Sequence, residues 1–240
     1  MTGSVPGRRL RSFWRPATTS RSSETATGFT SPIQRIIRSY EDPIIYVYAQ
    51  IRFHILRLHF LEEIGQYLPT EGAIVDIGCG FGLFSLFFAN QERRRHISGF
   101  DLNARRIETA RRSAARLGLD NVAFEIGDAS QKRLSAPVDA VYMLDIVHHI
   151  PPESVVPLIE NIARNLRPGG VLLIKDVADR PAYKRWFTWA LDKAMDCRAP
   201  VTYWPVEALK GLLAPHFTTI HVHSMVDYLP YPHVLYICRR

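Results

Sequence analysis

Residues 73–83 read Ala73-Ile74-Val75-Asp76-Ile77-Gly78-Cys79-Gly80-Phe81-Gly82-Leu83, an apolar run that passes directly into a glycine cluster. The run over residues 73–77 is too short for a helix and has the composition of a buried strand. Glycines at alternate positions let the main chain turn sharply and approach a ligand closely, because no Cβ stands in the way. Residues 83–89 are predicted to form a helix whose free N–H groups face this turn.

The spacing of the glycines excludes the common nucleotide-binding loops. The dinucleotide pattern G-x-G-x-x-G would need a third glycine where Leu83 stands, and no G-x-x-x-x-G-K-[ST] phosphate loop is present. Asp76 precedes the turn and Asp101 follows the next predicted strand, residues 96–100, so a pyrophosphate would be repelled. The two acids suit a ligand that carries an ammonium group, a sulfonium group and ribose hydroxyls.

The residues from Asp76 to Gly82, together with Asp101, resemble the first two motifs of the class I S-adenosylmethionine-dependent methyltransferases. The resemblance implies S-adenosylmethionine as the cofactor, with the methionine end over the glycine turn, the ribose diol on Asp101 and the adenine amino group at Asp128. Cys79 is expected to be a small packing residue of the loop. The predicted cofactor-binding residues are Asp76, Gly78, Cys79, Gly80, Asp101, Leu102, Asp128, Ala129 and Asp145.

Strands and helices alternate after residue 72, which is the pattern of a parallel sheet with crossover helices. We expect an α/β fold, a three-layer sandwich around a seven-stranded, mostly parallel sheet, preceded by an N-terminal helical cap. The predicted strands cover residues 73–77, 96–100, 122–126, 138–144, 171–175, 217–222 and 234–238. The predicted helices that follow the glycine turn cover residues 83–89, 104–117, 153–166 and 206–213.

Three regions are predicted: a disordered basic tail over residues 1–30, a helical cap over 31–69 and a methyltransferase domain over 70–240. The cap rests on apolar residues that recur at three- and four-residue steps up to Leu68, in one helix or in two helices with a single break. Its tyrosines are assigned to core packing or to contact with the cofactor. The tail is rich in Arg and Ser and poor in acids, which also fits an organelle transit peptide.

The net charge of +7 is concentrated in the tail. Residues 1–23 contain five arginines and no acid, and the remaining 25 basic and 23 acidic residues carry a net charge of only +2. A nucleic-acid partner is therefore not favoured, because it requires basic residues clustered on the folded domain. The three cysteines, Cys79, Cys197 and Cys238, lie far apart and indicate neither a disulfide framework nor a zinc site.

The segment after the fourth predicted strand contains His148 and His149 and resembles small-molecule members of the family, including quinone-type and lipid-precursor methyltransferases. It contains neither the Asn/Asp-Pro-Pro-aromatic run of amino-group methylases nor a Pro-Cys pair. A histidine beside the methyl group can act as general base for a hydroxyl, since its pKa is nearest neutrality. His148 and His149 are the candidate catalytic residues, with packing or helix capping as the alternative. No metal ion is implied.

An aromatic insertion separates the fifth strand from the helix at residues 206–213. It covers approximately residues 176–205 and interleaves tyrosines and tryptophans with basic residues. We interpret it as a lid over an apolar pocket; a helix that covers the sheet edge and a membrane-surface contact are alternatives. Residues 228–233 either add to the pocket or form a hairpin turn.

The sequence thus predicts a methyltransferase that uses S-adenosylmethionine and acts on a small hydrophobic, aromatic or lipid-linked acceptor, with O-methylation favoured. The alternatives are C-methylation of a quinone- or polyketide-like acceptor, methylation of RNA or protein, and a module that binds S-adenosylmethionine without catalysis. We expect a cytoplasmic protein, with peripheral contact to a membrane surface as an alternative location.

Overall fold

The computed structural model describes residues 31–56, 58–177, 201–225 and 233–240. Ser31–Arg240 belongs to one compact unit. The predicted tail, most of the aromatic insertion and residues 226–232 lie outside the described residues, so the expectations placed on them stay predictions.

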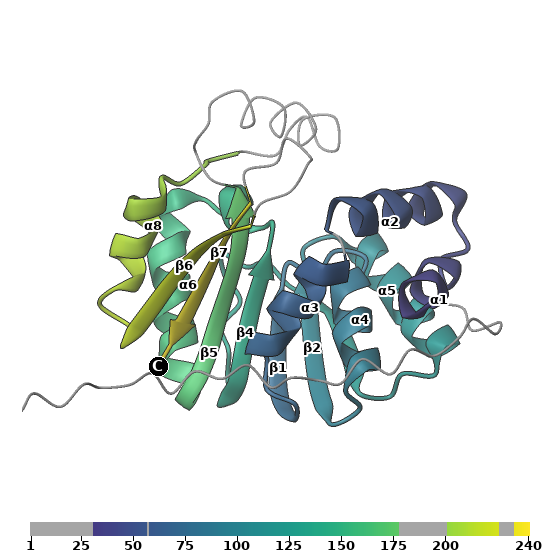
Figure 1. Cartoon of the computed structure of the whole chain (residues 1–240), viewed down its shortest axis with the longest axis horizontal. Helices are drawn as coiled ribbons and strands as arrows, with labels where there is room; N and C mark the ends of the chain where they lie inside the picture. The colour runs from purple at the N-terminus through teal and green to yellow at the C-terminus, as the bar shows by residue number, and fades with distance from the viewer. Residues whose placement is uncertain (1–30, 57, 178–200, 226–232) are drawn as a thin grey trace, which may run out of the picture. The chain divides into compact units, whose positions relative to one another are not determined.

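Seven strands form one sheet with the order β3-β2-β1-β4-β5-β7-β6 (Figure 1). Strands β1 to β5 are parallel to one another, and β7 runs antiparallel to both β5 and β6. The expected seven-stranded, mostly parallel α/β sheet is therefore confirmed. The strands are β1 Gly72–Ile77, β2 Arg95–Asp101, β3 Val122–Ile126, β4 Val138–Leu144, β5 Leu166–Val177, β6 Thr219–Met225 and β7 His233–Arg239.

Helices cover both faces of this sheet and produce three layers (Figure 1). One hydrophobic core contains residues of α1 to α5 and the other contains residues of α6 and α8, with strand residues contributing alternately to the two. The helices of the described residues are α1 Pro32–Arg38, α2 Pro43–Ile55, α3 Leu58–Tyr67, α4 Leu83–Gln91, α5 Ala104–Leu117, α6 Pro152–Asn165 and α8 Val206–Leu213, and a 3-10 turn, η1, lies at Val147–His149.

The helix ends follow from local chemistry. Asn103 caps α5 by accepting hydrogen bonds from the N–H groups of Arg105 and Arg106, and Gly118 ends the helix in the left-handed conformation at φ 62°. At the start of α2, Asp42 accepts hydrogen bonds from the N–H groups of Ile44 and Ile45. The predicted long N-terminal helix is two helices, α2 and α3, so the version with a single break is confirmed.

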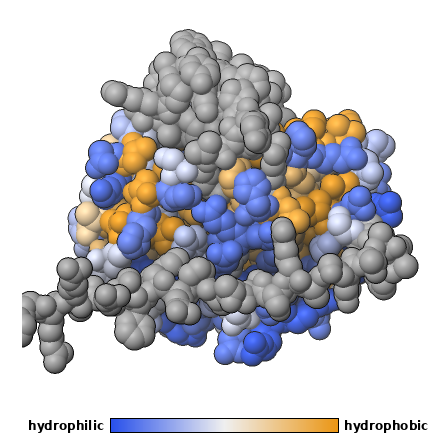
Figure 2. Space-filling view, in the orientation of Figure 1, coloured by the Kyte–Doolittle hydropathy of each residue, from blue (hydrophilic) through white to orange (hydrophobic). Residues whose placement is uncertain are grey.

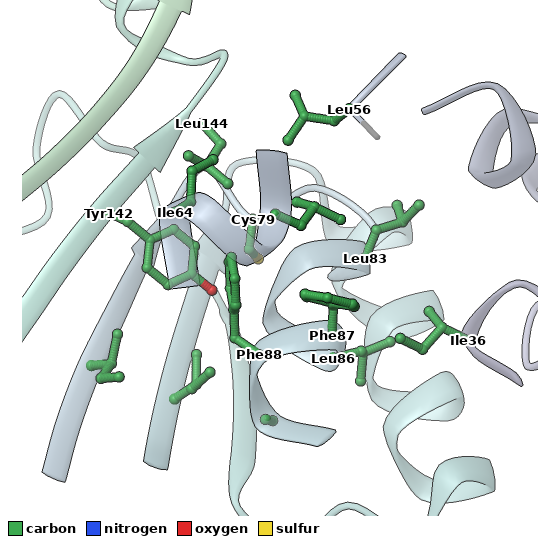
Figure 3. Packing of buried hydrophobic residues seen from close by; sticks show 14 of the residues in the cluster. Ile36, Leu56, Ile64, Cys79, Leu83, Leu86, Phe87, Phe88, Tyr142 and Leu144 are labelled. Atoms are coloured by element: carbon green, nitrogen blue, oxygen red, sulfur yellow. The ribbon is translucent and has the colours of Figure 1, made fainter. Parts of the chain in front are cut away.

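The first core lies between α4 and the sheet. Figure 3 shows Phe88 and Tyr142 packed edge to face beside Ile64 of α3, with Leu83, Leu86 and Phe87 along α4. The two rings of Phe88 and Tyr142 are 5.5 Å apart. The N-terminal helices therefore share one core with the sheet.

The fifth strand is longer at both ends than predicted. Asp176 pairs with Val234 and Val177 pairs with His233 of β7, so these residues belong to β5 rather than to the insertion. The extension of Asp176 and Val177 is too short to give a strand signal of its own, because its pairing is supplied by β7, more than fifty residues further on. The described part of the insertion, residues 201–205, leads directly into α8.

The sheet order changes direction between β1 and β4. Strands β2 and β3 continue on one side of β1, whereas β4 and β5 lie on the other. In an open parallel sheet, a ligand binds beyond the carboxyl ends of the strands at this kind of switch point. The topology therefore predicts a ligand site at the loops after β1, β2, β4 and β5.

Candidate active site

The glycine turn after β1 has the backbone geometry predicted for it. Gly78, Gly80 and Gly82 have positive φ angles of 76°, 56° and 76°. A Cβ on Gly78 would stand 2.5 Å from the side chain of Ile146, and one on Gly82 would stand 2.7 Å from Phe124. At Gly80 no atom lies within 4 Å of the Cβ position, so the space beside that residue is open. The turn is therefore packed on both sides and open in the middle.

Asp101 is fastened to this turn. Its carboxylate accepts hydrogen bonds from the N–H of Gly80, 3.0 Å away, and from the N–H of Asn103, 2.9 Å away. Arg106 of α5 approaches the same carboxylate at 4.0 Å. The side chain is buried, yet it lines the cavity described below. A carboxylate in this position can accept hydrogen bonds from the hydroxyl groups of a ribose.

Asp76 lies within β1 and belongs to a buried hydrogen-bond chain. The hydroxyl of Ser85 donates to Asp76 Oδ2 at 2.5 Å, and the Tyr142 hydroxyl donates to Ser85 Oγ at 3.2 Å. Burial raises the pKa of Asp76 to about 7, with the hydrogen bonds from Ser85 and Tyr142 opposing the shift and the charge of Asp101 adding to it. This carboxyl group is therefore close to half ionised at neutral pH, and a cation bound nearby would favour its charged form.

Asp145 follows β4 and is held between two cations. Lys175 of β5 donates to Asp145 Oδ1, and Arg52 of α2 donates to Oδ2 at 2.8 Å. Although burial alone would raise it, the pKa of Asp145 is held well below its usual range by the charges of Lys175 and Arg52. Burial lowers the pKa of the Lys175 ammonium, and the charge of Asp145 opposes that shift. We call these three residues the charge centre.

The main chain at Asp145 has a φ of 58°, the only positive value among the described non-glycine residues. Asp tolerates the left-handed region better than most residues, and such conformations concentrate at functional sites. Both carboxylate oxygens of Asp145 have protein partners, so the side chain connects the N-terminal helices to the ends of β4 and β5. This arrangement was not expected from the prediction that Asp145 binds the cofactor.

His148 is a buried residue of η1 and is paired with Asp176 at the end of β5. Asp176 Oδ1 contacts the ring Nδ1 of His148, and Oδ2 accepts a hydrogen bond from the main-chain N–H of His148 at 3.1 Å. The ring of Tyr203 stacks on His148 with a centroid separation of 5.6 Å. The ring centroid of His149 lies 4.1 Å from that of His148. An imidazole whose Nδ1 is held by a carboxylate is oriented for acid–base chemistry at Nε2.

A cavity of about 310 Å³ brings these groups together. Its wall contains eight of the predicted site residues, Asp76, Gly78, Cys79, Gly80, Asp101, Asp145, His148 and His149. Helix α2 contributes Tyr48, Ile51, Arg52 and Ile55, and the C-terminal half contributes Lys175, Val177 and His233. The volume lies within the range of ligand-binding cavities, toward its lower end.

Three predicted cofactor residues are absent from the described lining of this cavity. The side chain of Leu102 is 70% exposed. Asp128 Oδ1 accepts hydrogen bonds from the N–H and the hydroxyl of Ser130, and Ala129 packs against the second core. These contacts form a tight turn after β3. The assignment of Leu102, Asp128 and Ala129 to the adenosine end of the cofactor stays a prediction.

The sequence did not predict five residues of the site: Arg52, Ser85, Tyr142, Lys175 and Asp176. Lys175 and Asp176 had a usable signal, since a charged pair at the end of a buried strand resembles the acids at the other strand ends. Arg52 is the single charged residue within the apolar α2 helix, Pro43–Ile55. Nothing in the local sequence connects it to Asp145, which lies 93 residues further along the chain.

The N-terminal tyrosines have different roles. Tyr40 is buried and its hydroxyl donates to the carbonyl of Phe81 at 2.8 Å, whereas Tyr48 packs edge to face on the Phe81 ring and lines the cavity. Within the described residues, no group of three or more His, Cys, Asp or Glu side chains is arranged to hold a metal ion. In the same part of the chain, no helix is long and apolar enough to cross a bilayer.

Comparisons with known proteins agree with this geometry. Residues 74–170 match a family model described as a methyltransferase domain. A solved S-adenosylmethionine-dependent methyltransferase from Mesorhizobium loti superposes with a TM-score of 0.61 at 21% identity, over 75% of this chain and 96% of that one. Residues 74–170 are thus similar to a methyltransferase domain, and the fold is that of the class I S-adenosylmethionine-dependent methyltransferases.

Two curated relatives match about half of this chain. An ubiquinone biosynthesis O-methyltransferase of Xylella fastidiosa (strain 9a5c) is 30% identical over 52% of this chain and 50% of its own length. A carboxy-S-adenosyl-L-methionine synthase of Campylobacter curvus (strain 525.92) is 29% identical over 48% of each chain. The chain thus spans about half the length of the curated relatives it matches. S-adenosylmethionine is the cofactor of the class.

Proposed function

We propose that this protein transfers a methyl group from S-adenosylmethionine to an oxygen atom of a small hydrophobic, aromatic or lipid-linked acceptor. The observation that carries the proposal is the His148–Asp176 pair in the wall of the cavity that also contains the glycine turn and Asp101. The relative that is named an O-methyltransferase supports the choice of oxygen. The nearly neutral folded domain supports a small acceptor over a nucleic acid.

The described wall of the cavity suits the methionine end and the ribose of the cofactor. Gly80 leaves open space beside the main chain, and Asp101 presents a carboxylate next to it, as a ribose diol requires. Asp76, with a pKa near 7, becomes ionised when a cation such as the methionine ammonium is bound close by. When bound, the cofactor supplies an electrophilic methyl group on a positively charged sulfur.

The remaining work of the site is to orient and deprotonate the acceptor. Asp176 holds His148 Nδ1, which leaves Nε2 as the atom that removes the proton from an acceptor hydroxyl. The imidazolium formed in that step is stabilised by the Asp176 carboxylate. Ile51, Ile55 and Val177 give the cavity an apolar side, which excludes water from the reacting atoms.

The test is transfer of label from S-adenosylmethionine labelled in its methyl group to a panel of phenols, hydroquinones and fatty acids. We expect labelled product with a methoxy carbon shift in the NMR spectrum. Product labelled at a ring carbon would show that the protein catalyses C-methylation rather than O-methylation. Absence of label from every acceptor, in protein that binds S-adenosylhomocysteine, would contradict the choice of acceptor class.

A further inference from the structure

Helix α2 has an apolar outer face. Ile44, Val47 and Ile51 are 80%, 51% and 52% exposed, and Ile55 continues the same face one turn further on. The spacing of three and four residues puts all four on one side of the helix. Figure 2 shows hydrophobic surface over this part of the molecule. The inner side of α2, represented by Ala49 and Phe53, is buried in the core, and the polar residues Gln50 and His54 are exposed beside the apolar outer residues.

A helix on the surface of a globular domain normally has polar residues on its outer face. The exposed part of α2 has, beside Gln50 and His54, a line of branched aliphatic side chains, which we call the apolar stripe: Ile44, Val47, Ile51 and Ile55. Eleven residues separate its ends, which corresponds to about 16 Å along the helix axis. The stripe therefore has the length of an extended hydrocarbon chain rather than that of a single contact.

The apolar stripe is continuous with the candidate active site. Ile51 and Ile55 belong both to the stripe and to the wall of the cavity. Arg52 lies between them in sequence, but its guanidinium contacts Asp145 and lies over the ring of Phe84 at 5.6 Å. Its charge is thus directed into the charge centre, and the stripe enters the cavity without a charged residue on its surface.

We propose that the apolar stripe binds the hydrocarbon chain of the methyl acceptor. The acceptor is then an amphiphile, with its reactive head in the cavity and an alkyl or isoprenoid chain that leaves over Ile55 and Ile51 toward Val47 and Ile44. The inference rests on the proposed function and specifies its acceptor class. The cavity, at about 310 Å³, lies toward the lower end of the range of ligand-binding cavities, so a long chain of the acceptor extends beyond it.

Two other occupants fit the stripe less well. A dimer interface buries about 800 Å² on each partner, much more than four side chains in a line provide. A helix that binds an anionic membrane surface normally has several Lys or Arg residues along its polar face. Helix α2 contains one arginine, and that arginine contacts Asp145. Continuity with the cavity favours a single chain of the acceptor.

The experiment compares two gallate esters that share one phenolic head, methyl gallate and dodecyl gallate. Binding to the full chain is measured by calorimetry with saturating S-adenosylhomocysteine, with dodecyl gallate kept below its micelle concentration. The variants are Ile44→Ser and Val47→Ser, both outside the cavity wall. Val156→Ser is the matched control, because Val156 is an exposed apolar residue of α6, which packs against the other core.

We expect dodecyl gallate to bind at least tenfold more tightly than methyl gallate, and each stripe variant to reduce that preference about threefold or more. The control should keep the full preference, and methyl gallate should bind equally to all four proteins. A preference that is absent, or that is equal in the wild type and the stripe variants, overturns the inference. Either result leaves the proposed function intact if S-adenosylhomocysteine and methyl gallate still bind.

Two further measurements on the same proteins test whether the apolar stripe binds a second copy of the chain or a membrane surface. Wild-type dimers that become monomers in Ile44→Ser, seen by analytical ultracentrifugation, would show that a second copy covers the stripe. Flotation with vesicles of phosphatidylcholine and phosphatidylglycerol that is lost in both stripe variants would show a membrane surface. Either result overturns the inference. Loss of S-adenosylhomocysteine binding in the wild type would instead contradict the proposed function itself.

Discussion

Asp176 contacts His148 at two points, at the ring Nδ1 and at the main-chain N–H. The two contacts fix both the ring orientation and the position of η1 relative to β5. The main-chain carbonyl of His148 also accepts a hydrogen bond from the N–H of Thr202 at 2.8 Å, so the segment before α8 is attached to the same residue. His148 is thus anchored by β5 and by the chain that returns to α8.

The first prediction concerns this pair. Asp176→Asn should lower kcat on the order of 100-fold, because the amide no longer stabilises the imidazolium that forms when His148 takes a proton. The affinity for S-adenosylhomocysteine should stay unchanged, since Asp176 does not line the cavity directly. Calorimetry and single-turnover kinetics separate the two effects. Asp120→Asn, at a highly exposed carboxylate, is the control; an unchanged kcat in Asp176→Asn would remove His148 as the general base.

The second prediction concerns cofactor affinity. Asp101→Ala should weaken S-adenosylhomocysteine binding at least about 100-fold, because it removes two hydrogen bonds to a charged acceptor and releases the N–H groups of Gly80 and Asn103. The affinity of Asp101→Asn should lie between those of Asp101→Ala and the wild type, since the asparagine side chain keeps one carbonyl acceptor. The dissociation constants are measured by calorimetry. Equal dissociation constants for all three proteins would contradict the assignment of Asp101 as the residue that binds the ribose.

The third prediction uses the pH dependence of stability. The pKa of Asp76 is about 7 in the folded protein and near 4 in the unfolded chain. Between these values the folded state binds the extra proton, so the contribution of Asp76 to stability falls as the pH rises from 4 to 7 and is constant above 7. This difference between the folded and unfolded pKa corresponds to about 4 kcal/mol of stability.

The measurement is urea unfolding of the wild type and Asp76→Asn from pH 4 to pH 8, without cofactor. The free energy of unfolding of the wild type should decrease relative to that of the variant across this window. The asparagine keeps an acceptor for Ser85 but cannot ionise, so other titrating groups cancel in the difference. Parallel curves for the two proteins would contradict the raised pKa.

The fourth prediction concerns the charge centre. Lys175→Met should destabilise the fold by about 3–5 kcal/mol, because it removes a fully buried cation and leaves Asp145 with Arg52 as its remaining partner within the centre. Arg94→Met breaks an exposed pair with Glu71 and should cost less than about 1 kcal/mol. Denaturant unfolding measures both. Similar small losses in the two variants would show that the Lys175 pair contributes no more than a surface pair does.

Much of the fold was predictable because its signals are local. The strand over residues 138–144 and the helices over 104–117 and 206–213 have the predicted bounds, since apolar periodicity, an N-cap and a terminal glycine are all read within a few residues. The break between α2 and α3 was left open. Both helices are apolar at helical spacing, and the sequence there contains neither glycine nor proline.

The sequence by itself determined the fold class, the cofactor class and the glycine turn. These features depend on residues that are close together in the chain. They are the alternation of strands and helices, the positive φ at Gly78 and Gly82, and the acid at the end of the next strand. Only the tertiary structure decided that Arg52, Lys175 and Asp145 form one charge centre, that Asp176 holds His148, and that the apolar stripe of α2 runs into the cavity. These contacts join residues that are 28 to 93 positions apart. Their partners are chosen by sheet order and helix packing, which no local pattern of residues encodes.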